Sequence, residues 1–133
     1  MTAGTEASEP SASSPRRRVL VVDDDAEQLE ELVELFNEAG ISAASAKGAS
    51  EALEMLATVN PQLMLVDIKM PGIDGIKLAG FARSLDRRVA VVLMSGDWHA
   101  AEESRDRDDG IFAVVTKPLD PAWLVETARA LTV

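Results

Sequence analysis

Continuous apolar runs alternate along this chain with segments whose apolar residues recur every three or four positions. Continuous apolar runs are typical of strands buried on both faces of a parallel sheet. Apolar residues at every third or fourth position are typical of amphipathic helices. The predicted strands are 19–22, 41–46, 63–66, 89–94 and 111–115. The predicted helices are 26–39, 49–59, 75 to about 85, 99–109 and a last helix from 121.

Helix start and stop signals support these boundaries. Gly40 and Asn60-Pro61 follow predicted helices, and Asp74 and Asp120 precede them as candidate caps. The alternation predicts an α/β fold, a doubly wound five-stranded parallel sheet with five helices. The fourth helix, 99–109, is expected to be weak, because Ala100 and Ala101 are its only apolar contacts.

Composition narrows the function classes. The 133 residues fit one domain, with a disordered polar tail at 1–18 and a folded domain at 19–133. The net charge of −10 argues against nucleic-acid binding, and the absence of cysteine excludes disulfides and thiol chemistry. We find no membrane-spanning stretch and no signal peptide, so the expected location is the cytoplasm, without membrane partners.

Polar residues follow four of the predicted strands. Strand 19–22 ends in Asp23-Asp24-Asp25, and the later ones end at Asp67, Ser95 and near Lys117. Ligands of open α/β sheets bind beyond the carboxyl ends of the strands. Clustered carboxylates suit Mg²⁺, a carboxylate can act as a nucleophile toward phosphorus, and lysine and serine can bind phosphoryl oxygens. The set therefore favours phosphoryl transfer.

Each of these residues also has an ordinary interpretation. An aspartate after a strand is often a helix cap, a serine there is often a turn residue, and a lysine is often a surface charge. Their occurrence at four strand ends together makes the ordinary interpretation of the whole set improbable.

The motifs at these strand ends resemble the receiver domain of two-component response regulators. They are VLVVDDD, LVDIKMPGIDG, VVLMSG and VVTKPL, and the resemblance covers about residues 18–132. It implies a flavodoxin-like sheet of order 2-1-3-4-5.

The resemblance also implies roles for individual residues. Asp67 matches the phospho-acceptor, Lys117 and Ser95 match the residues that contact the phosphoryl group, and the Lys117-Pro118 bond is expected to be cis. The implied metal is Mg²⁺, with Mn²⁺ as a substitute. Its ligands would be Asp24 directly, Asp23 through water, Asp67, and the backbone carbonyl of Lys69. Asp25 matches a third acidic position but is expected to cap the first helix.

Two places depart from the family pattern: the helix at 99–109, which has few of the family's apolar anchors, and position 114. Val114 stands three residues before Lys117, where the family usually has an aromatic switch residue. Phe112 is expected on the same strand face as Val114 by parity, but not at the matching site.

Two further positions flank the expected path of the hydrolytic water. Lys69 and Asp97 lie two residues past Asp67 and Ser95, and opposite charges there could pair across the phosphoryl group. Independent solvated side chains are the ordinary alternative. Trp98 is expected beside the site, and His99 is expected to be exposed.

The favoured function is a phosphorelay module. It accepts a phosphoryl group from a histidine kinase or a histidine phosphotransfer protein and signals to a downstream protein target. We expect no attached output domain, a monomer or weak dimer, and no enzyme activity beyond self-phosphorylation and self-dephosphorylation. One alternative is a degenerate receiver that binds partners without phosphorylation. Another is a haloacid-dehalogenase-type phosphohydrolase that uses Asp23 of Asp23-x-Asp25, with Ser95, Lys117 and Asp108-Asp109 as its other motifs.

Overall fold

A computed structural model describes residues 19–72, 74–86, 88–105 and 111–132 of this chain. The expected tail at 1–18 and the Asp108-Asp109 pair lie outside the described residues. The strands are β2 (Val19–Val22), β3 (Ala43–Ala46), β4 (Leu63–Asp67), β5 (Ala90–Ser95) and β6 (Ile111–Thr116). They form one parallel sheet in the order β3-β2-β4-β5-β6, which confirms the expected order 2-1-3-4-5.

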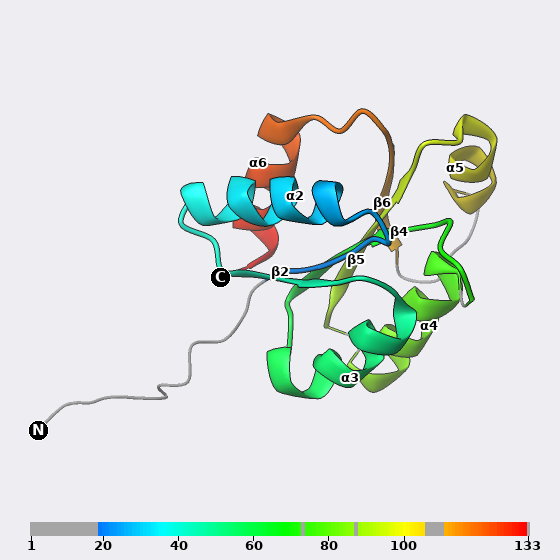
Figure 1. Cartoon of the computed structure of the whole chain (residues 1–133), viewed down its shortest axis with the longest axis horizontal. Helices are drawn as coiled ribbons and strands as arrows, with labels where there is room; N and C mark the ends of the chain where they lie inside the picture. Colours follow the sequence, from blue (N-terminus) through cyan, green and yellow to red (C-terminus); the bar gives the residue numbers. More distant parts are fainter. Residues whose placement is uncertain (1–18, 73, 87, 106–110, 133) are drawn as a thin grey trace, which may run out of the picture.

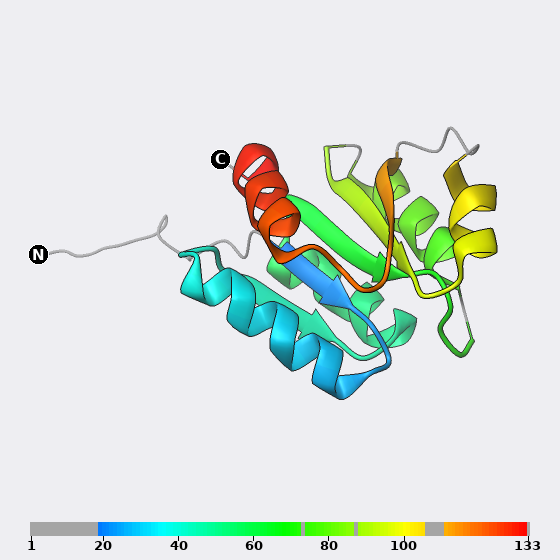
Figure 2. The same ribbon diagram turned by 90° about the horizontal axis from the view of Figure 1, so that it is seen from above.

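Five helices connect and follow these strands, as predicted. They are α2 (Ala26–Glu38), α3 (Ala49–Val59), α4 (Gly75–Leu85), α5 (Trp98–Arg105) and α6 (Pro121–Leu131). Figure 1 shows α2 and α6 on one face of the sheet and α3 and α4 on the other. Figure 2, turned by 90°, shows the strands running side by side between these layers.

Local side chains set the helix boundaries. The carboxylates of Asp25, Asp74 and Asp120 accept hydrogen bonds from backbone N–H groups in the first turns of α2, α4 and α6, so all three are N-caps. Gly40 follows α2 with φ of +80°, a conformation in which glycine has no steric penalty. Asn60 ends α3 in the left-handed region, with φ of 50°.

Apolar side chains are packed on both faces of the sheet. Every residue of β2 is therefore buried. Leu20 and Val22 pack toward α3 and α4, and Val19 and Val21 pack toward α2 and α6. Phe36 of α2 is fully buried on the second face. A strand with both faces covered has no polar positions to place, which explains the uninterrupted apolar run.

The expected position of Phe112 is wrong. The pairing of β5 with β6 runs from Val91↔Ile111 directly to Val92↔Ala113, so Phe112 is an extra residue in a β-bulge. The bulge breaks the two-residue alternation, and Ile111 shares the face of Val114 instead. Phe112 is 54% exposed.

Helix α5 packs against β5 and β6. Ala101 is fully buried, Ala100 is half-buried, and Trp98 at the start of the helix is 61% exposed. The helix covers the first part of the predicted 99–109 segment, and the rest of that segment lies outside the described residues. Within the described ranges, none of the helices has the length and hydropathy needed to cross a bilayer.

Candidate functional site

Strand register brings the predicted polar residues to one edge of the sheet. Val22 is paired with Val66, so Asp23 and Asp67 follow at the same level. Ser95 is paired with Thr116, the last residue of β6, and Lys117 follows it directly. The N–H of Lys117 donates to the carbonyl of Ser95 over 2.8 Å, which extends the ladder beyond β6.

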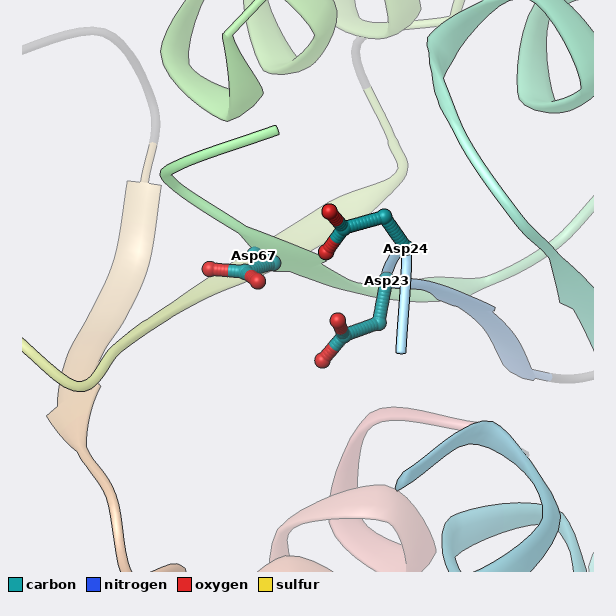
Figure 3. Close-up of side chains that lie close together, drawn as sticks. All are labelled: Asp23, Asp24 and Asp67. Carbon is teal, nitrogen blue, oxygen red and sulfur yellow. The ribbon is translucent and has the colours of Figure 1, made fainter. Parts of the chain in front are cut away.

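Three carboxylates meet at this edge. Asp23, Asp24 and Asp67 each offer an oxygen, and these oxygens lie within 4.8 Å of one another. Figure 3 shows Asp23 and Asp24 just after β2, close to Asp67 at the end of β4. Asp23 is fully buried, Asp67 is 7% exposed, and Asp24 is exposed. The cluster is therefore buried on one side and open to solvent on the other.

Lys117 partly neutralises the cluster. Its Nζ lies 3.1 Å from Oδ2 of Asp23 and 3.6 Å from Oδ2 of Asp67. Burial lowers the pKa of Lys117, but its hydrogen bond to Asp23 and the charges of Asp67 and Asp23 outweigh that effect and raise the pKa. Lys117 therefore stays an ammonium. The peptide bond between Lys117 and Pro118 is cis, as expected.

Asp67 is the electrostatically strained member of the cluster. Burial and the charge of Asp23 raise the pKa of Asp67 to about 6, against the opposing effects of Lys117 and the Lys69 N–H. That N–H lies 3.2 Å from Oδ1 of Asp67. One ammonium does not offset the repulsion among these carboxylates.

The donor set fits a hard divalent cation. Mg²⁺ prefers oxygen ligands and is usually bound by one or two carboxylates together with water and a phosphate oxygen. Asp24 and Asp67 supply such oxygens on the open side, and Asp23 lies beside them. Asp25 does not join them, because its Oδ1 accepts hydrogen bonds from the N–H groups of Glu27 and Gln28.

Ser95 lies at the end of β5, and its hydroxyl is bound within its own loop. Oγ accepts a hydrogen bond from the Asp97 N–H at 2.9 Å and donates one to the Asp97 carbonyl at 3.0 Å. Ser95 is 1% exposed.

Lys69 and Asp97 form an ion pair, as in the hypothesis of paired charges and not as independent solvated side chains. Nζ of Lys69 lies 2.6 Å from Oδ2 of Asp97 and joins the loop after β4 to the loop after β5. The hydrogen bond to Asp97 raises the pKa of Lys69 and lowers that of Asp97, although both side chains remain solvent-exposed. The pair thus lies beside Asp67, whose Oδ1 accepts the Lys69 N–H.

A family model described as the response regulator receiver domain matches residues 19–129. The chain belongs to this family. Among curated relatives, DNA-binding response regulator MtrA of Mycobacterium tuberculosis H37Rv is 30% identical over 115 residues, which are 86% of this chain and 50% of MtrA. A 14.6 kDa protein of Leptolyngbya boryana is 33% identical over 84% of this chain and 86% of its own length. This receiver domain therefore spans about half the length of MtrA.

Solved structures agree with this assignment. A CheY-like receiver domain protein from Methanospirillum hungatei has a TM-score of 0.79 at 26% identity, over 87% of this chain and 93% of that one. TrrA of Thermotoga maritima, solved in complex with Mg²⁺ and beryllium fluoride, has a TM-score of 0.76 at 30% identity. That match covers 86% of this chain and 98% of TrrA.

Gly75 is a residue of this receiver domain to which the sequence pattern gave no role at the site. Its N–H donates to the carbonyl of Ile68 over 2.9 Å, which draws the start of α4 against the end of β4. A Cβ there would overlap the carbonyl oxygen of Asp67 and lie 2.9 Å from the carbonyl carbon of that residue. Because glycine has no Cβ, the start of α4 can lie directly against the backbone carbonyl of Asp67.

We expect Gly75→Ala to destabilise the domain by about 1–3 kcal/mol, the usual cost of forcing extra atoms into a packed position. The clash should also displace the backbone of Asp67. Gly80→Ala is the matched control, because Gly80 lies on the same helix with nothing within 4 Å of its Cβ position. That change should be neutral or stabilise by up to ~1 kcal/mol. Equal chemical-denaturation midpoints for the two variants would contradict the close approach at Gly75.

Proposed function

We propose that this receiver domain accepts a phosphoryl group on Asp67 and signals through the resulting change in its surface. The observation that carries the proposal is the Asp67 carboxylate, nearly buried between Asp23 and Lys117 and open to solvent on the Asp24 side. An oxygen of Asp67 attacks phosphorus, the bond from phosphorus to the donor atom breaks, and an acyl phosphate forms.

The surrounding residues position and neutralise the incoming group. Lys117 already lies between Asp23 and Asp67, so its ammonium can move its contact to a phosphoryl oxygen with little displacement. The Ser95 hydroxyl would donate to another phosphoryl oxygen once its bond to Asp97 is released. Phosphoryl transfer needs mainly positioning and charge neutralisation, and these groups supply both.

Asp24, Asp67 and the backbone carbonyl of Lys69 would hold Mg²⁺, with Asp23 acting through water and Mn²⁺ as a substitute. When bound, the cation neutralises the charge that develops on the phosphoryl oxygens. The TrrA relative, whose structure contains Mg²⁺ and beryllium fluoride, supports this ligand chemistry.

The proposed phosphodonor is a phosphohistidine on a histidine kinase or a histidine phosphotransfer protein. The proposed location of the transfer is the cytoplasm. The proposed downstream target is another protein. Within 19–133 we assign no enzyme activity beyond transfer to and loss from Asp67. The DNA-binding description of MtrA applies to a protein of which this chain matches 50%, and we do not propose it for this chain. The net charge of −10 is likewise unfavourable for contact with a nucleic-acid backbone.

The test is exposure to acetyl phosphate, a small phosphodonor, with Mg²⁺ or with EDTA. The intact mass should increase by one phosphoryl group with Mg²⁺, and EDTA should suppress the increase because the carboxylates repel a phosphate dianion. An unchanged mass under both conditions would support the degenerate-receiver alternative. The phosphohydrolase alternative lacks support from Asp25, because that carboxylate caps α2.

The Lys69–Asp97 pair should slow loss of the phosphoryl group. It borders Asp67, and a closed pair there would obstruct water attacking phosphorus in line. Lys69→Ala and Asp97→Ala should therefore both shorten the lifetime of the acyl phosphate, as measured by release of inorganic phosphate. Lys77→Ala, an exposed lysine on α4, is the control. Wild-type decay rates in both site variants would show that the pair does not obstruct water.

A further inference from the structure

A groove lies between helix α2 and the edge of the sheet. Strand β3 is the outermost strand on this side of the described sheet, and Figure 2 shows α2 running alongside it. The groove has a volume of about 710 Å³. Leu29 and Val33 of α2 give it apolar lining, and Ser45 and Lys47 line it from the side of β3. Its volume is within the range of clefts that bind ligands.

The α2 wall of the groove carries a row of carboxylates. Glu30, Glu34 and Glu38 are spaced four residues apart, so they lie on one side of the helix with a rise of about 6 Å between neighbours. All three are exposed, and within the described ranges none of them takes part in an ion pair. Like charges at this spacing repel one another, and α2 contains no lysine or arginine to offset them.

Two cations of the folded domain lie near this row. Arg129 of α6 donates from Nη2 to the carbonyl of Ala39, just after α2, over 3.1 Å. Lys47 lines the groove at the end of β3. Since neither forms an ion pair with the row among the described residues, the groove still favours a cationic occupant.

Three consecutive arginines, Arg16-Arg17-Arg18, directly precede β2 in the sequence. They lie outside the described residues, but the place where they join β2 is described. The N–H of Val19 donates to the carbonyl of Ser42 over 3.1 Å, at the start of β3. Glu38 precedes Ser42 by four residues, so the Cα atoms of these two residues are at most about 14 Å apart. The arginines therefore begin beside the Glu38 end of the row.

The spacing of the arginines also matches that of the carboxylates. In an extended chain, Arg16 and Arg18 point to the same side at a separation of about 6.6 Å. Glu34 and Glu38 are separated by a helical rise of about 6 Å. A guanidinium can pair with a carboxylate while its methylene groups pack on an apolar surface such as that of Val33.

We propose that these arginines dock in the groove of their own chain. Arg18 then pairs with Glu38. Arg16 pairs with Glu34, about one helical turn further along. Exposed ion pairs are weak, but attachment to the same chain keeps the arginines at a high effective concentration near the groove. The docked segment covers this side of α2 and competes with any other basic chain for it.

The test places a nitroxide spin label in the N-terminal segment of the full chain and records amide signals by NMR. The protein has no cysteine, so Ala12→Cys provides a single attachment site. The amides of Glu34, Asn37 and Ser45 should lose most of their intensity relative to a sample with the label reduced. The amide of Lys77, on α4 across the sheet, should keep its intensity. About 1 M NaCl should restore the groove signals, because the Debye length falls to ~3 Å.

Charge variants identify the groove as the cause. Glu34→Gln with Glu38→Gln, made in the labelled protein, should restore most of the lost intensity. The control pair, Glu54→Gln with Glu126→Gln, removes the same number of charges from the exposed faces of α3 and α6 and should leave the loss unchanged. Full intensity at the groove amides before any change, or a loss that persists without Glu34 and Glu38, would overturn the inference.

A mixed sample distinguishes docking within one chain from docking between two copies. Isotope-labelled wild-type protein, mixed with spin-labelled Ala12→Cys protein that carries no isotope, should show no loss of intensity at Glu34 or Asn37. A loss in this mixture equal to that in the singly labelled chain would show that the arginines occupy the groove of a second copy, and would overturn docking within one chain.

Discussion

Asp67→Asn should abolish labelling by acetyl phosphate in the presence of Mg²⁺. An amide oxygen is a far weaker nucleophile than a carboxylate oxygen, and the change also removes one charged ligand of the proposed cation. The expected result is no detectable mass increase under conditions in which the wild type gains one phosphoryl group.

Asp120→Asn is the matched control for that experiment. Asp120 caps α6 outside the carboxylate cluster, and asparagine caps helices about as well as aspartate. This variant should be labelled like the wild type. Labelling of Asp67→Asn to the wild-type level would show that another residue accepts the phosphoryl group.

Asp67→Asn should also stabilise the metal-free protein near neutral pH. The pKa of Asp67 is raised from 3.8 to about 6, so the folded state binds its proton more tightly than the unfolded state does. The contribution of Asp67 to folding stability therefore falls as pH rises from about 4 to about 6, and stays at its lowest level above that range. The shift corresponds to an upper limit of roughly 3 kcal/mol at ~1.4 kcal/mol per pKa unit.

Thermal or urea unfolding in EDTA, run across this pH range, checks the prediction. The stability advantage of Asp67→Asn over the wild type should grow between about pH 4 and pH 6 and be constant above it. Gly80→Ala, which changes no titratable group, should show no such growth. An advantage that does not depend on pH would contradict the strain assigned to Asp67.

Periodicity alone identified most of the fold. The strand at Val19–Val22 and the helix at Ala49–Val59 have the predicted bounds, because an uninterrupted apolar run and a three-to-four spacing are strong local signals. The order of the strands was also predicted correctly, but that prediction came from the family resemblance and not from the hydrophobic pattern. The face of Phe112 was predicted wrongly because a one-residue bulge leaves no mark in hydrophobic alternation.

The candidate site was likewise predictable from the sequence only in part. Asp23, Asp67, Ser95 and Lys117 were predictable because each follows a buried strand, and parallel strands bring such residues to one edge. The contact of Gly75 with the Asp67 backbone and the hydrogen bonds of the Ser95 hydroxyl to Asp97 were not predicted. Both depend on how the loops after the strands lie in three dimensions. The glycine after Asp74 was a signal for the contact with the Asp67 backbone, because a glycine at the start of a helix can mark a close backbone approach.

Chemical trapping would identify the residue that carries the phosphoryl group, which we propose to be Asp67. Borohydride reduces an aspartyl phosphate to homoserine, and tandem mass spectrometry of the digested protein then locates the changed residue. After treatment with acetyl phosphate and Mg²⁺, we predict homoserine at position 67 and aspartate at positions 23 and 24. Homoserine at position 23, with Asp67 intact, would contradict the role of Asp67 as phospho-acceptor and favour the phosphohydrolase alternative.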